Sequence, residues 1–188
     1  MLIIKKEDYK ALNKIYPLID ADFDKRELLS KVTVLKGMIK GEMELYIAYD
    51  DESDIMLAYA LTMSKSVYKY VLLKYFAVFP WYREKGIGTG VMRLLNEKYA
   101  DRQGIIAEIP VFEDNDEEQI KRLTKFFNRF GYSEIKSDYK IGSAETKVLV
   151  KNIKNDKDIS PIYHRILRDF YSRCLPNGSK IIEINAVK

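Results

Sequence analysis

Cysteine, histidine and tryptophan are nearly absent from this chain of 188 residues, which contains one of each. The single cysteine, Cys174, excludes a disulfide within the chain and any zinc site built from several cysteines. A chain without disulfides suits a reducing compartment, so we expect a cytoplasmic protein with no bound metal. The single histidine, His164, lies beside an apolar stripe, where a surface or packing role is favoured over catalysis.

Long apolar runs are also missing, and neither sign of charge dominates. No run approaches the ~20 residues that span a bilayer, and the three apolar residues after Met1 are too few for a signal peptide. The 32 basic and 28 acidic residues leave a formal net charge of +4. Because the lysines are spread along the chain rather than gathered in a stripe, we expect neither a membrane nor a nucleic-acid partner.

The chain does contain 47% hydrophobic residues, enough for the core of one compact domain, in alternating strand and helix patterns. Strand patterns cover residues 2–5, 44–50, 55–64, 67–79, 104–112, 132–139 and 145–151. Helical spacing covers residues 9–19, 20–39, 87–102 and 116–130, the second with Asp20, Asp22 and Asp24 as candidate caps. The run over 67–79 begins VYKYVLLKY, which resembles a nucleic-acid-binding strand, but its apolar continuity predicts a strand buried at the centre of a sheet.

A linker-like segment, NIKNDKDIS, separates the last 36 residues from the rest of the chain. After this linker, Ser160 and Pro161 are the expected start of a helix, and a strand pattern, IIEI, follows near the end of the chain. We therefore divide the chain into a core, residues 1–152, and a C-terminal helix-strand extension, residues 153–188, packed on that core.

Three glycines crowd into the segment WYREKGIGTG, between an apolar strand and an amphipathic helix. A glycine-rich loop at a helix N-terminus offers free backbone N–H groups and the positive end of the helix dipole, and phosphate is the usual ligand. The GxxxxGK[ST] spacing of ATP-binding P-loops is absent, and Val91 replaces the third glycine of a dinucleotide-binding GxGxxG motif. ATP and NAD are therefore disfavoured as ligands.

The segment FAVFPWYREKGIGTGVMRLL resembles the acyl-CoA-binding motif of the GNAT superfamily of N-acetyltransferases. In that motif an apolar strand leads through Arg or Gln, two residues, Gly, one residue and Gly or Ala into a helix, positions filled here by Arg83, Gly86 and Gly88. A second block, EEQIKRLTKFFNRFGYSEI, is similar to the family's later helix, which carries an aromatic pair ahead of a Gly-aromatic pair. The resemblance covers residues 1 to about 151.

This resemblance implies the GNAT fold, an α/β (α+β) architecture in which a mixed, mostly antiparallel central sheet is splayed in the middle and flanked by helices on both faces. It also implies acetyl-CoA as co-substrate. The backbone of the strand would bond the pantetheine arm, the loop would hold the pyrophosphate, and the later helix would contact the cofactor. The residues implied are Phe76, Ala77 and Val78 on the strand, Arg83, Glu84, Lys85, Gly86, Ile87, Gly88, Thr89 and Gly90 in the loop, and Phe127 and Arg129 on the later helix.

The catalytic groups are less defined by the resemblance. Glu108, in the apolar strand IIAEIP, is the candidate base for the acceptor amine, although an outward orientation without chemical role is an equal alternative. Many relatives protonate the leaving thiolate with a tyrosine at the position that Phe127 occupies here. Tyr139, Tyr132 or a water molecule could substitute, and Tyr139 is our candidate.

The expected activity is transfer of an acetyl group from acetyl-CoA to a primary amine by direct attack in a ternary complex. A small-molecule acceptor is favoured over a protein, because the tail and the helices over residues 7–40 could narrow the acceptor groove. The acidic run EDNDEE favours a cationic amine. The alternatives are a non-catalytic acyl-CoA-binding regulatory module, which Phe127 would suit, and a protein N-acetyltransferase. We expect a monomer or homodimer.

Overall fold

The computed structural model describes residues 1–114, 117–136, 139–141, 144–154, 158–174 and 182–184. The described strands are β1 (Leu2–Glu7), β2 (Met43–Asp50), β3 (Met56–Met63), β4 (Tyr70–Val78), β5 (Gly104–Val111), β6 (Ser133–Ile135), β7 (Tyr139–Ile141), β8 (Ala144–Asn152) and β9 (Ile182–Ile184). The described helices are α1 (Leu12–Asp22), α2 (Lys31–Ile39), a short 3-10 turn (Pro80–Tyr82), α3 (Ile87–Lys98), α4 (Glu117–Asn128) and α5 (Tyr163–Cys174).

The described strands form one sheet in the order β1-β2-β3-β4-β5-β8-β7-β9, and β6 also pairs with β8. Every pairing is antiparallel except that of β4 with β5, which is parallel. The mixed, mostly antiparallel sheet is therefore confirmed, with the expected central strand in place. The single strand expected over residues 132–139 is wrong, because β6 and β7 form two separate short strands.

A β-bulge at Lys74 divides β4 into two halves. Leu73 pairs with Thr62 of β3 and Tyr75 pairs with Leu61, so Lys74 has no partner on that side. Before the bulge, Tyr70 and Leu72 belong to the core cluster that includes α1, whereas after it the odd-numbered Tyr75 and Ala77 do. The extra residue has reversed the alternation of the strand, as bulges do.

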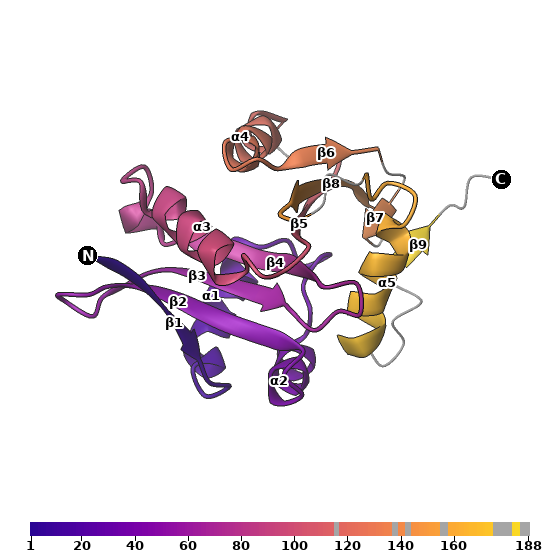
Figure 1. Cartoon of the computed structure of the whole chain (residues 1–188). Helices are drawn as coiled ribbons and strands as arrows, with labels where there is room; N and C mark the ends of the chain where they lie inside the picture. The colour runs from indigo at the N-terminus through magenta and orange to yellow at the C-terminus, as the bar shows by residue number, and fades with distance from the viewer. Residues whose placement is uncertain (115–116, 137–138, 142–143, 155–157, 175–181, 185–188) are drawn as a thin grey trace.

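The parallel pairing of β4 with β5 ends at the same place. It covers only Tyr70–Leu73 and Gly104–Ala107, whereas β4 continues to Val78 on β3 and β5 continues to Val111 on β8. In Figure 1 the part of the sheet that contains β5 and β8 turns away from the part that contains β1 to β4. The two central strands therefore leave facing edges unpaired beyond the bulge.

Helices cover both faces of the sheet, and each face has its own core. Residues of α1, α2 and α5 pack in one cluster, with Ile15, Val34 and Phe170 among its most buried members. Residues of α3 and α4, including Met92 and Phe127, pack in the other. Figure 1 shows α3 and α4 on the opposite side of the sheet from α2.

The second helix starts later than the sequence predicted. Instead of an aspartate, Ser30 is the N-cap of α2, and its side chain accepts a hydrogen bond of 3.2 Å from the Thr33 amide. Residues 23–30 form a loop, which we call the α1–α2 loop. The spacing of Leu28, Val32, Leu35 and Ile39 predicts a buried stripe, which is wrong at Val32 and Ile39, since these are 58% and 66% exposed. The helix buries Val34 and Gly37 instead.

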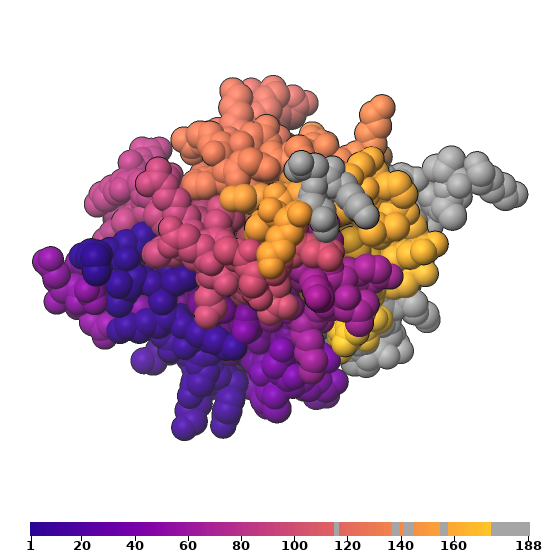
Figure 2. Space-filling model, viewed as in Figure 1, coloured from indigo at the N-terminus to yellow at the C-terminus, as the bar shows by residue number. Residues whose placement is uncertain are grey.

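The C-terminal helix α5 lies against the sheet and contributes to its core. Ile166, Leu167 and Phe170 are buried in the cluster shared with α1 and α2. Asp169 accepts hydrogen bonds of 3.1 Å from the Ser66 side chain and from the Val67 amide. In Figure 2 the orange to yellow side chains of this segment lie directly against the rest of the molecule.

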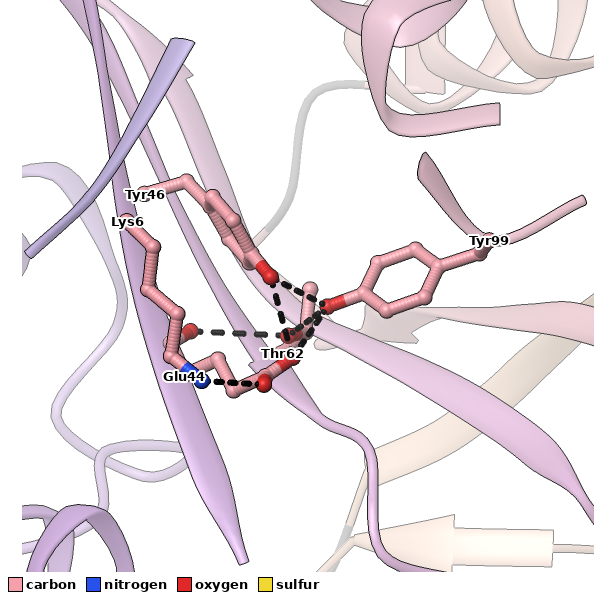
Figure 3. A network of polar contacts seen from close by, with 5 residues as sticks. All are labelled: Lys6, Glu44, Tyr46, Thr62 and Tyr99. Carbon is pink, nitrogen blue, oxygen red and sulfur yellow. Dashed lines mark hydrogen bonds and ion pairs between the residues drawn. The ribbon is translucent and has the colours of Figure 1, made fainter. Parts of the chain in front are cut away.

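A polar network fixes the C-terminal end of α3 to the sheet (Figure 3). The Tyr99 hydroxyl donates to Glu44 Oε2 at 2.8 Å and lies 2.7 Å from the Thr62 hydroxyl. Glu44 also accepts from Lys6 and Tyr46. Burial raises the pKa of Glu44, but hydrogen bonds from Lys6 and Tyr99 outweigh it and leave the pKa below its usual value. The network anchors the C-terminal end of α3 to β2 and β3.

Candidate active site

The loop before α3 has the backbone shape of an anion site. Glu84 and Gly86 both adopt left-handed conformations, with φ of 64° and 77°, which turn successive amides toward one side. In the described structure the amides of Ile87, Gly88 and Thr89 donate to no backbone carbonyl, and the first helical bond runs from the Gly90 amide to Gly86 at 3.0 Å. Free amides and the positive helix end together favour a phosphate here.

The two glycines inside α3 have different neighbours. A Cβ at Gly88 would lie 3.4 Å from Val78 Cγ2 and 3.6 Å from the Phe126 ring, at the mouth of the space between β4 and α4. A Cβ at Gly90 would lie 2.4 Å from Leu2 Cδ2, so this glycine allows α3 to pack on β1. Close packing on β1 is thus a reason for Gly90 that does not depend on a ligand.

The basic residues near the loop are partly engaged by protein groups. Arg83 Nε donates to the carbonyl of Val78 at 2.9 Å, and its guanidinium lies 3.4 Å from Asp22 Oδ1. Lys85 lies over the ring of Tyr82, with Nζ 5.6 Å from the ring centroid, and Arg129 lies 5.5 Å from the Phe126 ring. Lys85 and Arg129 are both exposed.

A cleft of about 840 Å³ occupies the space where β4 and β5 separate. We call it the β4–β5 cleft. One end is lined by Val78, Arg83 and Gly88, next to the free amides of α3. The other end is lined by residues of the α1–α2 loop and of the segment after β5, including Glu27 and Phe112. A single opening therefore joins the anion site to the face that carries α1, α2 and α5.

Aromatic side chains from α4 form one wall of this cleft. Phe126 stacks on Phe76 of β4, with ring centroids 6.1 Å apart. Phe127 is buried and meets Tyr132 edge to face at 5.2 Å. The wall presents carbon surface to the cleft, and Phe127 brings no hydroxyl to it.

At the floor of the cleft, a buried lysine and a buried glutamate share a tyrosine hydroxyl. The side chains of Lys74 and Glu108 are 1% and 3% exposed, and Lys74 Nζ lies 3.6 Å from Glu108 Oε2. The Tyr171 hydroxyl, from α5, donates to Glu108 Oε2 at 2.5 Å and accepts from Lys74 at 3.0 Å. Glu108 Oε1 has no hydrogen-bond partner among the described residues. Glu108 therefore points inward, with one oxygen still to be satisfied.

The α1–α2 loop narrows the other end of the cleft. Arg26 lies over the Phe112 ring, 3.8 Å from its centroid, and donates to Asp24 and to Asp114 at 2.6 and 2.8 Å. Hydrogen bonds from Arg26 lower the pKa of Asp24 to about 2, and they also lower the pKa of Asp114. The contact joins two loops that lie on opposite sides of the cleft mouth.

Seven of the fifteen residues expected from the sequence line this cleft, and the structure adds others; the seven are Phe76, Ala77, Val78, Arg83, Gly88, Glu108 and Phe127. Tyr139 lies on β7, separated from β5 by β8, and its side chain falls outside the described residues. Lys74, Tyr171 and Glu27 were missed. A lysine inside an apolar strand pattern is a signal that could have identified Lys74, whereas Tyr171 occupies an ordinary stripe position in its helix.

The described residues include groups that fit acetyl-CoA. In the described ranges, no three His, Cys, Asp or Glu side chains are placed to hold a metal ion. The free amides at α3 suit a pyrophosphate, the unpaired β4 edge suits an amide-bearing arm such as pantetheine, and Gly88 leaves room where a side chain would enter the cleft. None of the helices in the described part of the chain combines the length and apolar character of a membrane span.

Comparison with known proteins agrees with these features. The sequence model of the family described as "Acetyltransferase (GNAT) family" matches residues 11–132. No curated protein sequence matches the chain. Among solved structures, an acetyltransferase from the GNAT family of Bacteroides thetaiotaomicron is 16% identical with a TM-score of 0.69, covering 87% of this chain and 93% of that chain.

Two further solved structures have named acceptors. The ribosomal-protein-S18-alanine N-acetyltransferase from Escherichia coli is 15% identical with a TM-score of 0.62, covering 84% of this chain and 97% of that chain. The spermidine N-acetyltransferase from Vibrio cholerae is 12% identical with a TM-score of 0.60, covering 81% of this chain and 94% of that chain. At such identities the likeness shows a shared fold, and the two acceptors differ in kind.

Proposed function

Because the chain belongs to the GNAT family of acetyltransferases, we propose that it transfers an acetyl group from acetyl-CoA to the primary amine of a small molecule. The observation that carries this proposal is the separation of β4 from β5 beyond Leu73 and Ala107. The resulting cleft is lined by Gly88 at the start of α3 and by Glu108, whose Oε1 has no hydrogen-bond partner among the described residues. A cofactor lying in it would place its thioester next to an acceptor on the other face.

The cofactor would be held mainly by backbone groups. The amides at the start of α3, residues 86–89, would bind the pyrophosphate, with Lys85 and Arg129 nearby as exposed cations. The unpaired edge of β4 over Phe76–Val78 would bond the pantetheine amides as an added strand does. Phe126 and Phe127 would cover its apolar stretch. Bound acetyl-CoA supplies the thioester whose carbonyl carbon the amine attacks.

The amine must lose its proton before it can attack. A lysine-like amine has a pKa of about 10.4, so its neutral form at pH 7 costs roughly 4–5 kcal/mol. Glu108 Oε1, which has no partner among the described residues, is available to accept an N–H of the amine. Direct attack within a ternary complex then forms the amide and releases the thiolate of coenzyme A. We retain Tyr139 as the proposed proton donor to that thiolate.

The narrow mouth of the cleft at the α1–α2 loop supports a small acceptor rather than a protein chain. Arg26 joins the α1–α2 loop to Asp114 and stacks on Phe112, which narrows the mouth on that side. A folded protein surface would have to displace this contact, whereas a small amine would not. We expect the protein to be cytoplasmic and to be a monomer or a homodimer.

Thiol release tests this proposal directly. We expect the purified protein to release free thiol from acetyl-CoA only when a suitable primary amine is present. The panel would contain spermidine, cadaverine, lysine ethyl ester, ethylamine and a peptide beginning with alanine. Acetylated product identified by mass spectrometry would name the acceptor class. Release of thiol with the peptide alone would instead support a protein N-acetyltransferase.

A non-catalytic acyl-CoA-binding module is the second candidate, and one observation favours it. Phe127 occupies the position where many relatives place the tyrosine that protonates the thiolate, and its buried ring contacts Tyr132. Such a module would bind acetyl-CoA without releasing thiol to any amine in the panel.

A further inference from the structure

The end of the β4–β5 cleft next to the α1–α2 loop is lined by a second carboxylate, that of Glu27, in addition to Glu108. We propose that Glu27, on the α1–α2 loop, and Glu108, on β5, together bind the acceptor as an ammonium ion, and that Glu27 takes its proton. This inference rests on the proposed acetyltransferase function. It gives the acceptor a chemical class, an organic cation whose reactive primary amine arrives protonated.

The surroundings of the Glu108 carboxylate suit the binding of a cation. Its Oε2 already receives Tyr171 and lies 3.6 Å from Lys74, so this half of the carboxylate is engaged. Its Oε1 is buried and lacks a hydrogen-bond partner among the described residues, and Glu108 is one of the residues that line the cleft. A buried carboxylate oxygen without a donor is costly, and an ammonium N–H would satisfy it.

The backbone of Glu27, which lines the same cleft as Glu108, is held by hydrogen bonds. The hydroxyl of Tyr75, the residue after the bulge, donates to the Glu27 carbonyl at 3.1 Å and accepts from the Leu29 amide at 2.7 Å. The Glu27 amide donates to the carbonyl of Asp24 at 3.1 Å. These bonds tie the loop to β4, so the Glu27 side chain enters the cleft from an ordered backbone.

The charges around Glu27 leave its carboxylate without an ion pair of its own. Asp24 and Asp114 share Arg26, but in the described ranges no lysine or arginine nitrogen lies within 4.0 Å of the Glu27 carboxylate. Burial raises the pKa of Glu27 above its usual 4.5, and the negative charge of Glu108 adds to the effect. Lys74 and the Asp24 amide act in the opposite direction. A carboxylate with a raised pKa is a better base near neutral pH.

The proton and the acetyl group can be followed through the step. The ammonium gives one proton to the Glu27 carboxylate and becomes a neutral amine, still bonded to Glu108. Its nitrogen lone pair then forms the bond to the thioester carbon and the carbon–sulfur bond breaks. The proposed donor Tyr139 protonates the thiolate, and the second nitrogen proton restores the Tyr139 hydroxyl. The products are the amide and free coenzyme A, and Glu27 returns its proton to solvent.

The test compares wild type, Glu27→Gln and Glu97→Gln, with the most active amine of the panel, from pH 7 to about pH 10. Glu97 is exposed on α3, so its substitution removes the same charge at a distance from the cleft. At pH 7 we expect Glu27→Gln to lower kcat/KM by about 100-fold, and Glu97→Gln to stay within about twofold of wild type. The Glu27→Gln deficit should shrink as the pH rises, because more of the amine is then neutral in solution. Affinity for acetyl-CoA should be unchanged in both variants.

The outcomes separate this inference from the proposed function. If wild type turns the amine over and Glu27→Gln retains its activity, or loses it equally at every pH, the Glu27 assignment is overturned and the acetyltransferase stands. If wild type binds acetyl-CoA but releases no thiol with any amine, both proposals fail.

Thermal melting shows whether the variant is intact. A carboxyl with a raised pKa in the folded state lowers stability as the pH rises from its usual 4.5 through the raised value. The amide of Glu27→Gln does not ionise, so the variant avoids this loss of stability and should melt at a higher temperature than wild type at pH 7. If it melts lower, Glu27→Asp carries the kinetic test, because it keeps a carboxylate and should keep a wild-type pH dependence. If the kcat/KM of Glu27→Asp shows the same pH dependence as that of Glu27→Gln, the assignment of Glu27 as the base is overturned.

Discussion

A lysine and a glutamate, both nearly inaccessible to solvent, lie at the floor of the cleft and share the hydroxyl of Tyr171. Burying two charges costs several kcal/mol per ion, which a short hydrogen-bond chain and mutual attraction only partly offset. Such a cluster contributes little net stability, yet removal of one member leaves the other charge uncompensated. The arrangement fixes where Glu108 points, which is what the acceptor site requires.

Removal of one of the two buried charges should therefore lower the stability of the fold more than removal of both. We expect Lys74→Met to lower the free energy of unfolding by about 3–5 kcal/mol, because Glu108 would stay buried without its cation. The double variant Lys74→Met/Glu108→Gln should recover much of that loss. Urea unfolding at pH 7 measures both, and equal losses in the single and double variants would contradict the account.

The residue scale is also where sequence reasoning was least complete. Glu108 could be proposed from its apolar flanks, but six residues could not show which face it occupies. Tyr171 could not be assigned, because its partner Glu108 is 63 positions away and its own stripe position indicates only packing. Glu27 follows a charged run whose pairing depends on how the α1–α2 loop folds over β4.

At the scale of single elements, α3 connects the ligand loop to the body of the protein. Its N-terminal end presents free amides, and Tyr99 at its C-terminal end enters the network of Glu44, Thr62 and Tyr46 (Figure 3). The helix and its loop were predictable, since the glycine pattern and the apolar stripe are both local. The start of α2 was not, because three aspartates and Ser30 all have the chemistry of an N-cap.

Loss of the Tyr99 hydroxyl tests this anchor. Tyr99→Phe removes the donor to Glu44 and leaves the Thr62 hydroxyl without that partner, at an expected cost of about 1–3 kcal/mol in the free energy of unfolding. Tyr9→Phe, at an exposed tyrosine, should change it little. Urea unfolding of both variants is the measurement, and a Tyr99→Phe variant as stable as wild type would show that the network does not hold the helix.

For the whole molecule, the central opening results from two features of β4 acting together. The bulge at Lys74 reverses the strand, and the pairing with β5 stops after four residues on each strand. The apolar continuity of β4 predicted its central place, but not the bulge, because one extra residue leaves no mark in a run that is apolar on both faces.

The C-terminal helix is part of one of those cores, and its removal should be felt by the whole fold. Phe170 is 1% exposed in the cluster shared with α1 and α2. We expect Phe170→Ala to lower the free energy of unfolding by about 3–5 kcal/mol, and Ser172→Ala, on the exposed side of α5, to have little effect. Chemical denaturation measures the free energy of unfolding of both variants. A small decrease for Phe170→Ala would mean that α5 contributes little to the stability of the fold.

Calorimetric titration of acetyl-CoA into wild type, Gly88→Glu and Val32→Glu tests the central claim most directly. The Gly88→Glu side chain would start 3.4 Å from Val78 Cγ2, enter the β4–β5 cleft and bring a negative charge beside the pyrophosphate site. Val32→Glu adds the same charge at an exposed position on α2. The account predicts micromolar binding by wild type and Val32→Glu, and its loss in Gly88→Glu. Absence of binding by wild type, or unchanged binding by Gly88→Glu, would contradict it.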